Sequence, residues 1–267
     1  MSIVDRNSRL AALVDELSEV ALYLWQRGWA ERNGGNISAN ITDMLDGDYT
    51  PLSTFPLPRP FPAIAGCAFL VTGTGKRMRD IARQPMNNAV VLRLHPSGNA
   101  YDLVADYPIP PTSELPAHLA IHEQASLRHS PAKVVCHTHP TELVALTHHR
   151  RFLQPGALGR LLWSMIPETR IIVPRGVGIV PYELPGSLAL ANATVKALEY
   201  HDVVLWEKHG CLATGDSLAE TFDAIDTLAK SAAIYLAALS AGQEPEGLSD
   251  QQLDDLAAAF HLPTSPA

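Results

Sequence analysis

The stretch Val134–His139 reads VVCHTH and places two histidines one residue apart at the end of an apolar run. The apolar run predicts a buried strand, and side chains two residues apart on a strand point to the same face. His137 and His139 would therefore lie side by side, as two ligands of one metal ion do. Catalytic zinc usually takes three protein ligands and keeps one position open, so a third ligand is expected from elsewhere in the chain.

Among the eleven histidines, His209 is the most distinctive candidate for that third ligand because it lies in WEKHGCLATG, at a turn between two apolar strands. Such a turn can aim an imidazole at a neighbouring strand end, and Gly210 lets the backbone come close. The alternative is that each of these histidines is a capped or solvated side chain. His-x-His at the end of an apolar strand favours the metal site.

Other metal patterns fit less well. His118 and His122 are four residues apart on a predicted helix, but Leu119 stands where the zincin pattern needs glutamate. We expect these two on one helix face, in the core or behind the site. HTHPTE also resembles part of a cupin motif, but the TELVALT that follows predicts a helix where a cupin continues as a strand. Cys136 would point away from the face of His137 and is expected in the core.

Glu114 in PTSELPAH is the best candidate for a proton-transfer group beside such a metal. Thr112 or Ser113 would cap the following helix, and Pro116 is tolerated in its first turn, so Glu114 would lie at the helix N-terminus. The alternative is a carboxylate that complements the helix dipole.

Two glycine-rich turns, ERNGGNIS (residues 31–38) and VTGTGK (residues 71–76), could expose backbone N–H groups to an anion. Neither is a Walker A loop, because Leu70 stands where the first glycine is needed and Arg77 replaces serine or threonine. Together with Ser113 at a helix start, they suggest a phosphate held by neutral donors.

These residues need an α/β framework. The apolar pattern predicts a first helix that ends at Gly28 and a long helix opened by Ser217, and residues 43–66 read as a proline-rich surface excursion. Short strands mixed with helices predict one layered α/β domain with a mostly antiparallel sheet. The expected strands are 37–41, 68–72, 89–94, 100–104, 134–139, 170–173, 177–180, 202–206 and 211–214; further helices are expected near 112–122, from 141, at 187–200 and after Ser249.

The 267 residues are 46% hydrophobic and carry a net charge of −8, which disfavours a nucleic-acid or anionic-membrane partner. The N-terminal MSIVDRNSRL lacks the apolar stretch of a secretory signal, and no apolar helix reaches the length of a membrane span. Cys67, Cys136 and Cys211 show no paired spacing. A reducing cytoplasm fits that pattern.

The chain resembles the class II aldolase/adducin superfamily and, within it, the group of L-rhamnulose-1-phosphate aldolases. The matching stretches keep the family's order over nearly the whole chain, and WAERNGGN with TSELPAH is narrower than the superfamily pattern. These stretches are GWAERNGGNIS, LVTGTGK, PTSELPAHLAIH, HTHPTELVALT, PRGVGIVPYELPGS and LWEKHGC with SLAETFDAIDTLAKSA.

The resemblance implies one αβα domain of three layers over residues 1–267, around a mostly antiparallel sheet and assembled as a C4 homotetramer. It implies a zinc-dependent aldolase that reversibly cleaves a ketose phosphate, best matched by L-rhamnulose 1-phosphate, to dihydroxyacetone phosphate and L-lactaldehyde. Its site residues here are His137, His139 and His209 for one zinc ion, Glu114 as acid/base, Asn33, Gly35, Asn36, Thr74 and Ser113 for phosphate, and Glu168 near a neighbouring subunit's site.

Three positions depart from the rhamnulose group: Thr74, Pro140 and Lys208 replace serine, alanine and an aromatic residue. None of them removes an expected ligand, but they leave the aldehyde open. A fuculose-phosphate-type aldolase, a pentulose-phosphate epimerase, a dehydratase of the same superfamily, or a non-catalytic adducin-like interaction module are the alternatives.

Overall fold

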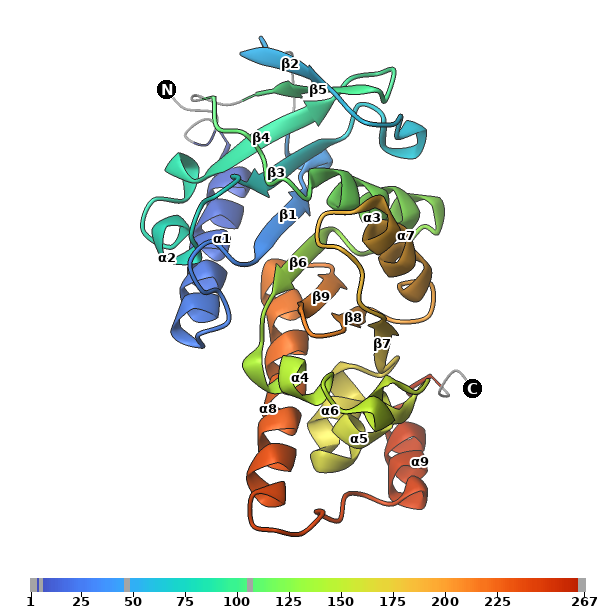
Figure 1. The fold of residues 1–267 in the computed structure, drawn as a ribbon. Helices are drawn as coiled ribbons and strands as arrows, with labels where there is room; N and C mark the ends of the chain where they lie inside the picture. Colours follow the sequence, from blue (N-terminus) through green and yellow to red (C-terminus); the bar gives the residue numbers. More distant parts are fainter. Residues whose placement is uncertain (1–3, 5–6, 46–48, 105–107, 264–267) are drawn as a thin grey trace. The chain divides into compact units, whose positions relative to one another are not determined.

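A computed structural model describes residue 4 and residues 7–45, 49–104 and 108–263 (Figure 1). The chain forms two compact units. The first contains residues 1–138 and 214–219, and the second contains residues 139–213 and 220–267. The chain passes from the first unit to the second between Thr138 and His139, inside the VVCHTH stretch.

In the described part of the first unit, six strands pair antiparallel in the order β2-β5-β4-β3-β1-β6, and Figure 1 shows β1, β3, β4 and β5 running side by side. The strands are β1 (Asn36–Asn40), β2 (Ser53–Pro56), β3 (Ala68–Thr72), β4 (Ala89–Leu94), β5 (Ala100–Leu103) and β6 (Val134–Thr138). The helices are α1 (Ser8–Gln26), α2 (Met78–Ile81) and α3 (Leu115–Leu127), with 3-10 turns η1 (Thr42–Met44), η2 (Pro62–Ile64) and η3 (Pro85–Asn87).

Local sequence explains the main elements of this unit. All five residues of β3 and all five of β6 are buried, as expected of short apolar runs in the interior of a sheet. The Asn7 side chain accepts the backbone N–H of Leu10 at 3.0 Å and caps α1. The predicted end of α1 is also confirmed, because the helix stops at Gln26 and Gly28 has a φ of +74°.

In the second unit, β7 pairs parallel with β8, and β8 pairs antiparallel with β9. The strands are β7 (Val177–Val180), β8 (Val203–Trp206) and β9 (Gly210–Gly215). The helices are α4 (Thr141–Leu146), α5 (Ala157–Met165), α6 (Pro167–Ile172), α7 (Leu188–Ala197), α8 (Leu218–Leu239) and α9 (Asp250–Ala259), with the 3-10 turn η4 (Arg150–Leu153).

The pairing of β7 with β8 corrects the expected mostly antiparallel sheet, because the strands of the protein form a mixed arrangement. The reason lies in α7, which connects β7 to β8. A helical crossover returns the chain in the same direction, whereas a hairpin reverses it. The sequence identified both strands and the helix, and what it missed was that the two strands are neighbours.

Three further expectations were wrong or incomplete. Residues 170–173 are not a strand, because they belong largely to α6, which begins with Pro167 in its first turn. The proline-rich excursion contains the strand β2, which is exposed along its length and ends at Pro56. Such an exposed edge tolerates proline. The short helix α2 and the helix α5 were not expected.

Within the described residues, no helix is long and apolar enough to cross a membrane. Among the described residues, no disulfide joins Cys67, Cys136 or Cys211.

Candidate functional site

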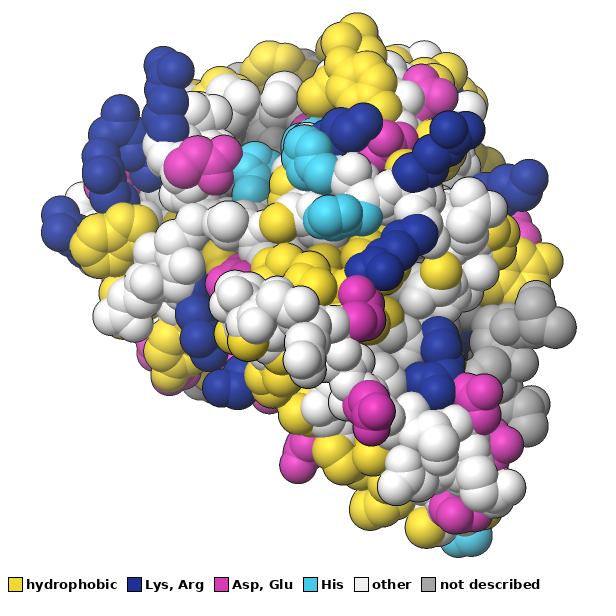
Figure 2. All heavy atoms as spheres, turned by 60° about the horizontal axis from the view of Figure 1, so that its bottom comes forward, with side chains coloured by type: hydrophobic (Ala, Val, Ile, Leu, Met, Phe, Trp, Pro, Cys, Tyr) yellow, Lys and Arg dark blue, Asp and Glu magenta, His cyan; other side chains and the backbone are white. Residues whose placement is uncertain are grey.

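The structure brings the three predicted metal ligands together. One ring nitrogen from each of His137, His139 and His209 lies within 4.8 Å of the others. The rings of His139 and His209 have centroids 5.4 Å apart. Figure 2 shows histidine side chains that reach the surface close to one another, with lysine and arginine side chains on the same face.

A tight hairpin turn positions His209. The turn joins β8 to β9, and Lys208 adopts a φ of +58° within it. The backbone N–H of His209 donates to the carbonyl of Trp206 at 3.0 Å, and the N–H of Lys208 donates to Thr147 Oγ1 at 2.8 Å. The Trp206 ring also packs against the His209 ring, with centroids 5.0 Å apart. These contacts fix the turn, and so the direction of the imidazole.

The pairing of β1 with β6 positions His137, whose side chain is almost fully buried. Asn36 lies opposite His137 in this register. Gly35, just before Asn36, has a φ of +78°, and a Cβ added there would lie 2.8 Å from the carbonyl oxygen of His137. Only glycine accommodates both that conformation and that approach. The ERNGGN turn is therefore shaped partly by the strand that carries His137.

The donor set of this histidine group suits a transition metal. Imidazole nitrogens are ligands for zinc, copper, iron and nickel, and three protein ligands leave a coordination position open for a substrate oxygen. His139 and His209 are partly exposed, so that a small molecule can reach the group. The arrangement can therefore hold a metal ion that acts on a bound substrate.

Glu114 is the N-cap residue of α3, but its side chain makes no capping hydrogen bond. Its Oε2 atom instead accepts a hydrogen bond from Asn36 Nδ2 at 2.9 Å. Thr112 and Ser113 are not the cap, contrary to expectation. Thr112 Oγ1 accepts the backbone N–H of Glu114 at 3.3 Å, in a turn that delays the start of the helix. The Glu114 carboxylate is thus held beside Asn36, which pairs with His137 on the neighbouring strand.

Behind Glu114, the predicted face of His118 and His122 is buried, with 1% and 4% of each residue exposed. Ser38 Oγ lies 2.7 Å from His118 Nδ1 and 2.8 Å from His122 Nε2, and His118 Nε2 bonds to Asn36 Oδ1. Burial lowers the pKa of His118 to about 4; burial and the neighbouring His118 lower that of His122 to about 3. Sequence reasoning placed the two histidines correctly but did not identify Ser38 as their shared partner.

The two glycine-rich turns and the segment before α3 lie together in the first unit. Gly73 and Pro111 form an isolated β-bridge, flanked by hydrogen bonds from Thr74 N–H to the Pro110 carbonyl (2.9 Å) and from Thr112 N–H to the Thr72 carbonyl (2.8 Å). Thr72 Oγ1 also accepts the backbone N–H of Ile37 at 3.0 Å. The predicted phosphate-binding residues Asn33, Gly35, Asn36, Thr74 and Ser113 are on these joined segments. Asn33, Thr74 and Ser113 are exposed.

Comparison with known proteins identifies the family of this chain. Residues 15–236 match the family described as Class II Aldolase and Adducin N-terminal domain. The chain belongs to the class II aldolase and adducin family.

Similar proteins narrow the relationship within the class II aldolase family. A rhamnulose-1-phosphate aldolase of Bacteroides thetaiotaomicron is 48% identical over 266 residues, which cover 98% of this chain and 99% of that protein. One from Pectobacterium carotovorum is 36% identical, with 89% of each chain covered. The crystal structure of a sugar-phosphate aldolase from Thermotoga maritima is similar at a TM-score of 0.78 with 33% identity, and it covers 89% of this chain and 99% of that one.

Two other predicted residues of this class II aldolase chain lie outside the histidine group. Glu168 is exposed in the first turn of α6. Cys136 is buried, as predicted, and burial raises the pKa of its thiol to about 12. Such a thiol stays protonated, so Cys136 is core and not a nucleophile.

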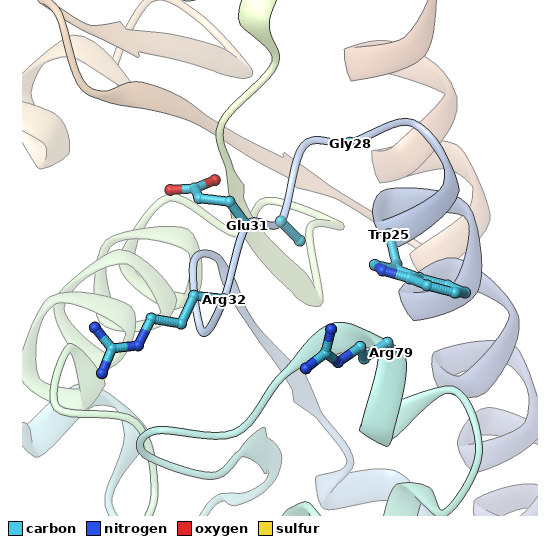
Figure 3. A pocket seen from close by; sticks show the side chains of 6 residues that line it. Trp25, Gly28, Glu31, Arg32 and Arg79 are labelled. Carbon is cyan, nitrogen blue, oxygen red and sulfur yellow. The ribbon is translucent and has the colours of Figure 1, made fainter.

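A separate surface pocket of about 180 Å³ lies in the first unit (Figure 3). Figure 3 shows the side chains of Arg32 and Arg79 on opposite sides of this pocket, with Trp25 at the end of α1. Among the described residues, neither arginine has a hydrogen bond or an ion pair. Arg32 adopts a φ of +51°, immediately before Asn33. No sequence pattern indicates this pocket, because its arginines are 47 positions apart.

Proposed function

We propose that this protein is a zinc-dependent aldolase that reversibly cleaves L-rhamnulose 1-phosphate to dihydroxyacetone phosphate and L-lactaldehyde. The observation that carries the proposal is the 48% identity to a rhamnulose-1-phosphate aldolase over nearly the full length of both chains. The three-histidine group and the nearby carboxylate supply the side chains that the reaction needs.

His137, His139 and His209 are the proposed zinc ligands. When bound, zinc supplies positive charge that stabilises the negative charge developing on the substrate oxygens as the C3–C4 bond breaks. The chain itself contributes a rigid presentation of the imidazoles, through the β1–β6 pairing and the fixed turn at Lys208. Neutral imidazoles also leave the full charge of the metal available to the substrate.

Glu114 is the proposed proton-transfer group. In the cleavage direction it delivers a proton to C3 of the three-carbon product, and in the synthetic direction it removes that proton. Its carboxylate is half-buried and is oriented by Asn36. A carboxylate that only complemented the dipole of α3 would not require the hydrogen bond from Asn36 on β1.

Asn33, Gly35, Thr74 and Ser113, with Asn36, are the proposed phosphate-binding residues. Their amide, hydroxyl and backbone N–H groups are neutral donors on segments that the Gly73–Pro111 bridge joins. The Asn36 amide already contacts Glu114 and His118, so that one N–H of its amide remains for substrate. Phosphate binding remote from the C3–C4 bond would orient the carbon chain.

The proposal also covers the domain organisation and the oligomeric state of the protein. We propose one three-layer catalytic domain over residues 1–267 and a homotetramer in which Glu168 contributes to a neighbouring subunit's site. The exposure of Glu168 on α6 is compatible with contact to another subunit. The free cysteines agree with a reducing cytoplasm.

A panel of phosphorylated ketoses, with identification of the products, tests the proposed reaction. We expect the highest kcat/KM with L-rhamnulose 1-phosphate and equal amounts of the two three-carbon products. A higher kcat/KM with L-fuculose 1-phosphate would indicate a fuculose-phosphate-type aldolase. Epimerisation of a pentulose phosphate would indicate an epimerase, and loss of water from a substrate would indicate a dehydratase. No turnover by fully metallated protein on any member would favour an adducin-like interaction module.

A further inference from the structure

A continuous chain of hydrogen bonds runs from the core of the first unit to the carboxylate of Glu114. It starts at His122 and passes through Ser38, His118 and Asn36. The residues come from α3 and β1, which lie about 80 positions apart in the sequence. Glu114 is the only charged member of the chain, and it is also its outermost member.

The chemistry of the end groups fixes the direction of every bond. An ionised carboxylate can only accept, so Asn36 must present its NH₂ group to Glu114 and its oxygen to His118. His118 therefore donates from Nε2 and accepts at Nδ1. The Ser38 hydroxyl must donate to that Nδ1 atom, and its oxygen then accepts from Nε2 of His122. All four hydrogen bonds point toward Glu114.

The burial of the two histidines supports this assignment. A neutral imidazole has one donor and one acceptor, as the directed chain requires, whereas a charged imidazole would donate from both nitrogens. His118 and His122 are almost fully buried, and the Phe69 ring packs against His122 with centroids 4.8 Å apart. The low pKa values caused by this burial keep both rings neutral near pH 7.

We propose that His118, Ser38 and His122 are positioning residues for the proton transfer at Glu114, which act by holding the Asn36 amide in one orientation. A flipped amide would turn its oxygen toward the Glu114 carboxylate and its NH₂ group toward the N–H of His118. Both contacts would then be repulsive. The hydrogen-bond chain thus gives the Glu114 carboxylate a fixed donor, the Asn36 NH₂ group. Successive hydrogen bonds of one direction also polarise one another. This inference rests on the proposed role of Glu114.

The alternative is that the two histidines and Ser38 only fill the core. Apolar side chains of similar volume would fill the same space without the cost of burying polar groups. A core role predicts loss of stability on substitution, but no dependence of catalysis on Glu114. A positioning role predicts that the catalytic loss disappears when Glu114 can no longer transfer a proton.

The test compares His118→Gln with His118→Leu, in full-length zinc-loaded protein. Glutamine can place an N–H group near the position of the imidazole Nε2, whereas leucine has a similar volume and no donor. We expect kcat of His118→Leu to fall about 10–100-fold with KM changed less than about threefold. We expect His118→Gln to recover a large part of kcat. Zinc content and the thermal midpoint, measured on each variant, separate misfolding from mispositioning.

A double-mutant cycle completes the test. In the Glu114→Gln background, His118→Leu should change the residual rate less than about twofold. The same loss in both backgrounds, or a His118→Gln variant as slow as His118→Leu, would overturn the proposal. If His118→Leu does not fold, Ser38→Ala tests the proposal instead, because this change deletes only one hydroxyl group. A wild-type kcat for Ser38→Ala would also overturn the proposal. Full activity of Glu114→Gln alone would instead refute the proposed function.

Discussion

Asn36 Nδ2 lies 2.9 Å from Glu114 Oε2, and the backbone of Asn36 pairs opposite His137 in the β1–β6 register. One residue thus connects the proposed proton-transfer group to the strand that carries a proposed metal ligand. Gly35, just before Asn36, allows the turn to approach the carbonyl of His137. Metal binding and proton transfer are therefore expected to depend on the same turn.

Loss of His209 should remove the metal. His209→Ala leaves two histidines that are only one residue apart, and two ligands make a weak zinc site. We expect bound zinc to fall from about one per chain to below about 0.1 after dialysis. Elemental analysis measures it, and His148→Ala, which removes an exposed histidine outside the group, is the matched control. Full zinc in His209→Ala would assign the third ligand elsewhere.

Asn33 offers a cleaner test of phosphate binding than Asn36, because Asn36 also contacts Glu114. Asn33→Ala should raise KM for the phosphorylated ketose about tenfold, consistent with one lost hydrogen bond to a charged group of about 1.5 kcal/mol. KM for the unphosphorylated ketose should stay nearly constant. Asn36→Ala should instead lower kcat on both substrates. Equal effects of Asn33→Ala on both substrates in steady-state kinetics would show that Asn33 is structural.

The arginines of the Figure 3 pocket should assist capture of the anionic substrate. The protein carries a net charge of −8, which repels a phosphate dianion. Arg32, which precedes Asn33, and Arg79 provide two positive charges in a pocket that also contains one carboxylate, that of Glu31. Replacing both by glutamine should lower kcat/KM about three- to tenfold at low salt, and the difference should shrink at 0.5 M salt. Lys230→Gln, at an exposed site on α8, is the control. A salt-independent loss would contradict an electrostatic role.

The buried histidines should make the protein sensitive to mild acid. In the unfolded chain their imidazoles titrate near about 6.5, but burial lowers the pKa of His118 to about 4 and of His122 to about 3 in the folded chain. Between these limits the unfolded state binds more protons. The free energy of unfolding therefore has its full value, as far as these two histidines are concerned, above about pH 6.5. It decreases as the pH falls toward 4, by up to about 1.4 kcal/mol per pH unit for each histidine.

Urea unfolding between pH 4.5 and 6, with a chelator present throughout, measures this dependence. His122→Phe removes one titrating group and retains a ring against Phe69. We expect its slope of unfolding free energy against pH to be lower than wild type by about one proton. His129→Asn, at an exposed position, should keep the wild-type slope. Identical slopes for wild type and His122→Phe would show that His122 is protonated in the folded state.

The sequence was sufficient to find the histidine group because its geometry is mostly local. The expected strand 134–139 ends at Thr138, so His139 follows β6 directly, and His209 follows from a hairpin turn. The parallel pairing of β7 with β8 could not be predicted, since it depends on how α7 returns the chain. Residues 170–173 were misread because Ile171, Ile172 and Val173 are typical of strands, while the helix α6 depends on packing.

The hydrogen-bond chain was hidden from the sequence for a similar reason. His118 and His122 were placed on one helix face, but their partner Ser38 lies on β1, about 80 positions earlier. A serine in a strand is common, so Ser38 alone did not indicate a partner for the two histidines. The role of Asn36 was likewise incomplete, because its position in a glycine-rich turn suggested phosphate and gave no sign of Glu114.

Glu114→Gln separates proton transfer from helix capping. Glutamine keeps the shape of the side chain and can still hydrogen-bond to Asn36, but it cannot exchange a proton near pH 7. If Glu114 only complemented the dipole of α3, the change would cost about 0.3–1 kcal/mol of stability and little activity. Its side chain makes no capping hydrogen bond, so the change should not remove an N-cap. We expect kcat to fall by about 10²–10⁴, with zinc content and folding near wild type.

Solvent-deuterium exchange into dihydroxyacetone phosphate provides the decisive measurement. It reports the same proton transfer without an aldehyde, so it should fall in parallel with kcat in Glu114→Gln. Glu246→Gln, which neutralises an exposed carboxylate after α8, should exchange at the wild-type rate. A fully metallated Glu114→Gln protein with wild-type exchange would exclude Glu114 as the proton-transfer group. Glu168→Gln would then be the next variant to measure, because we propose that Glu168 contributes to a neighbouring subunit's site.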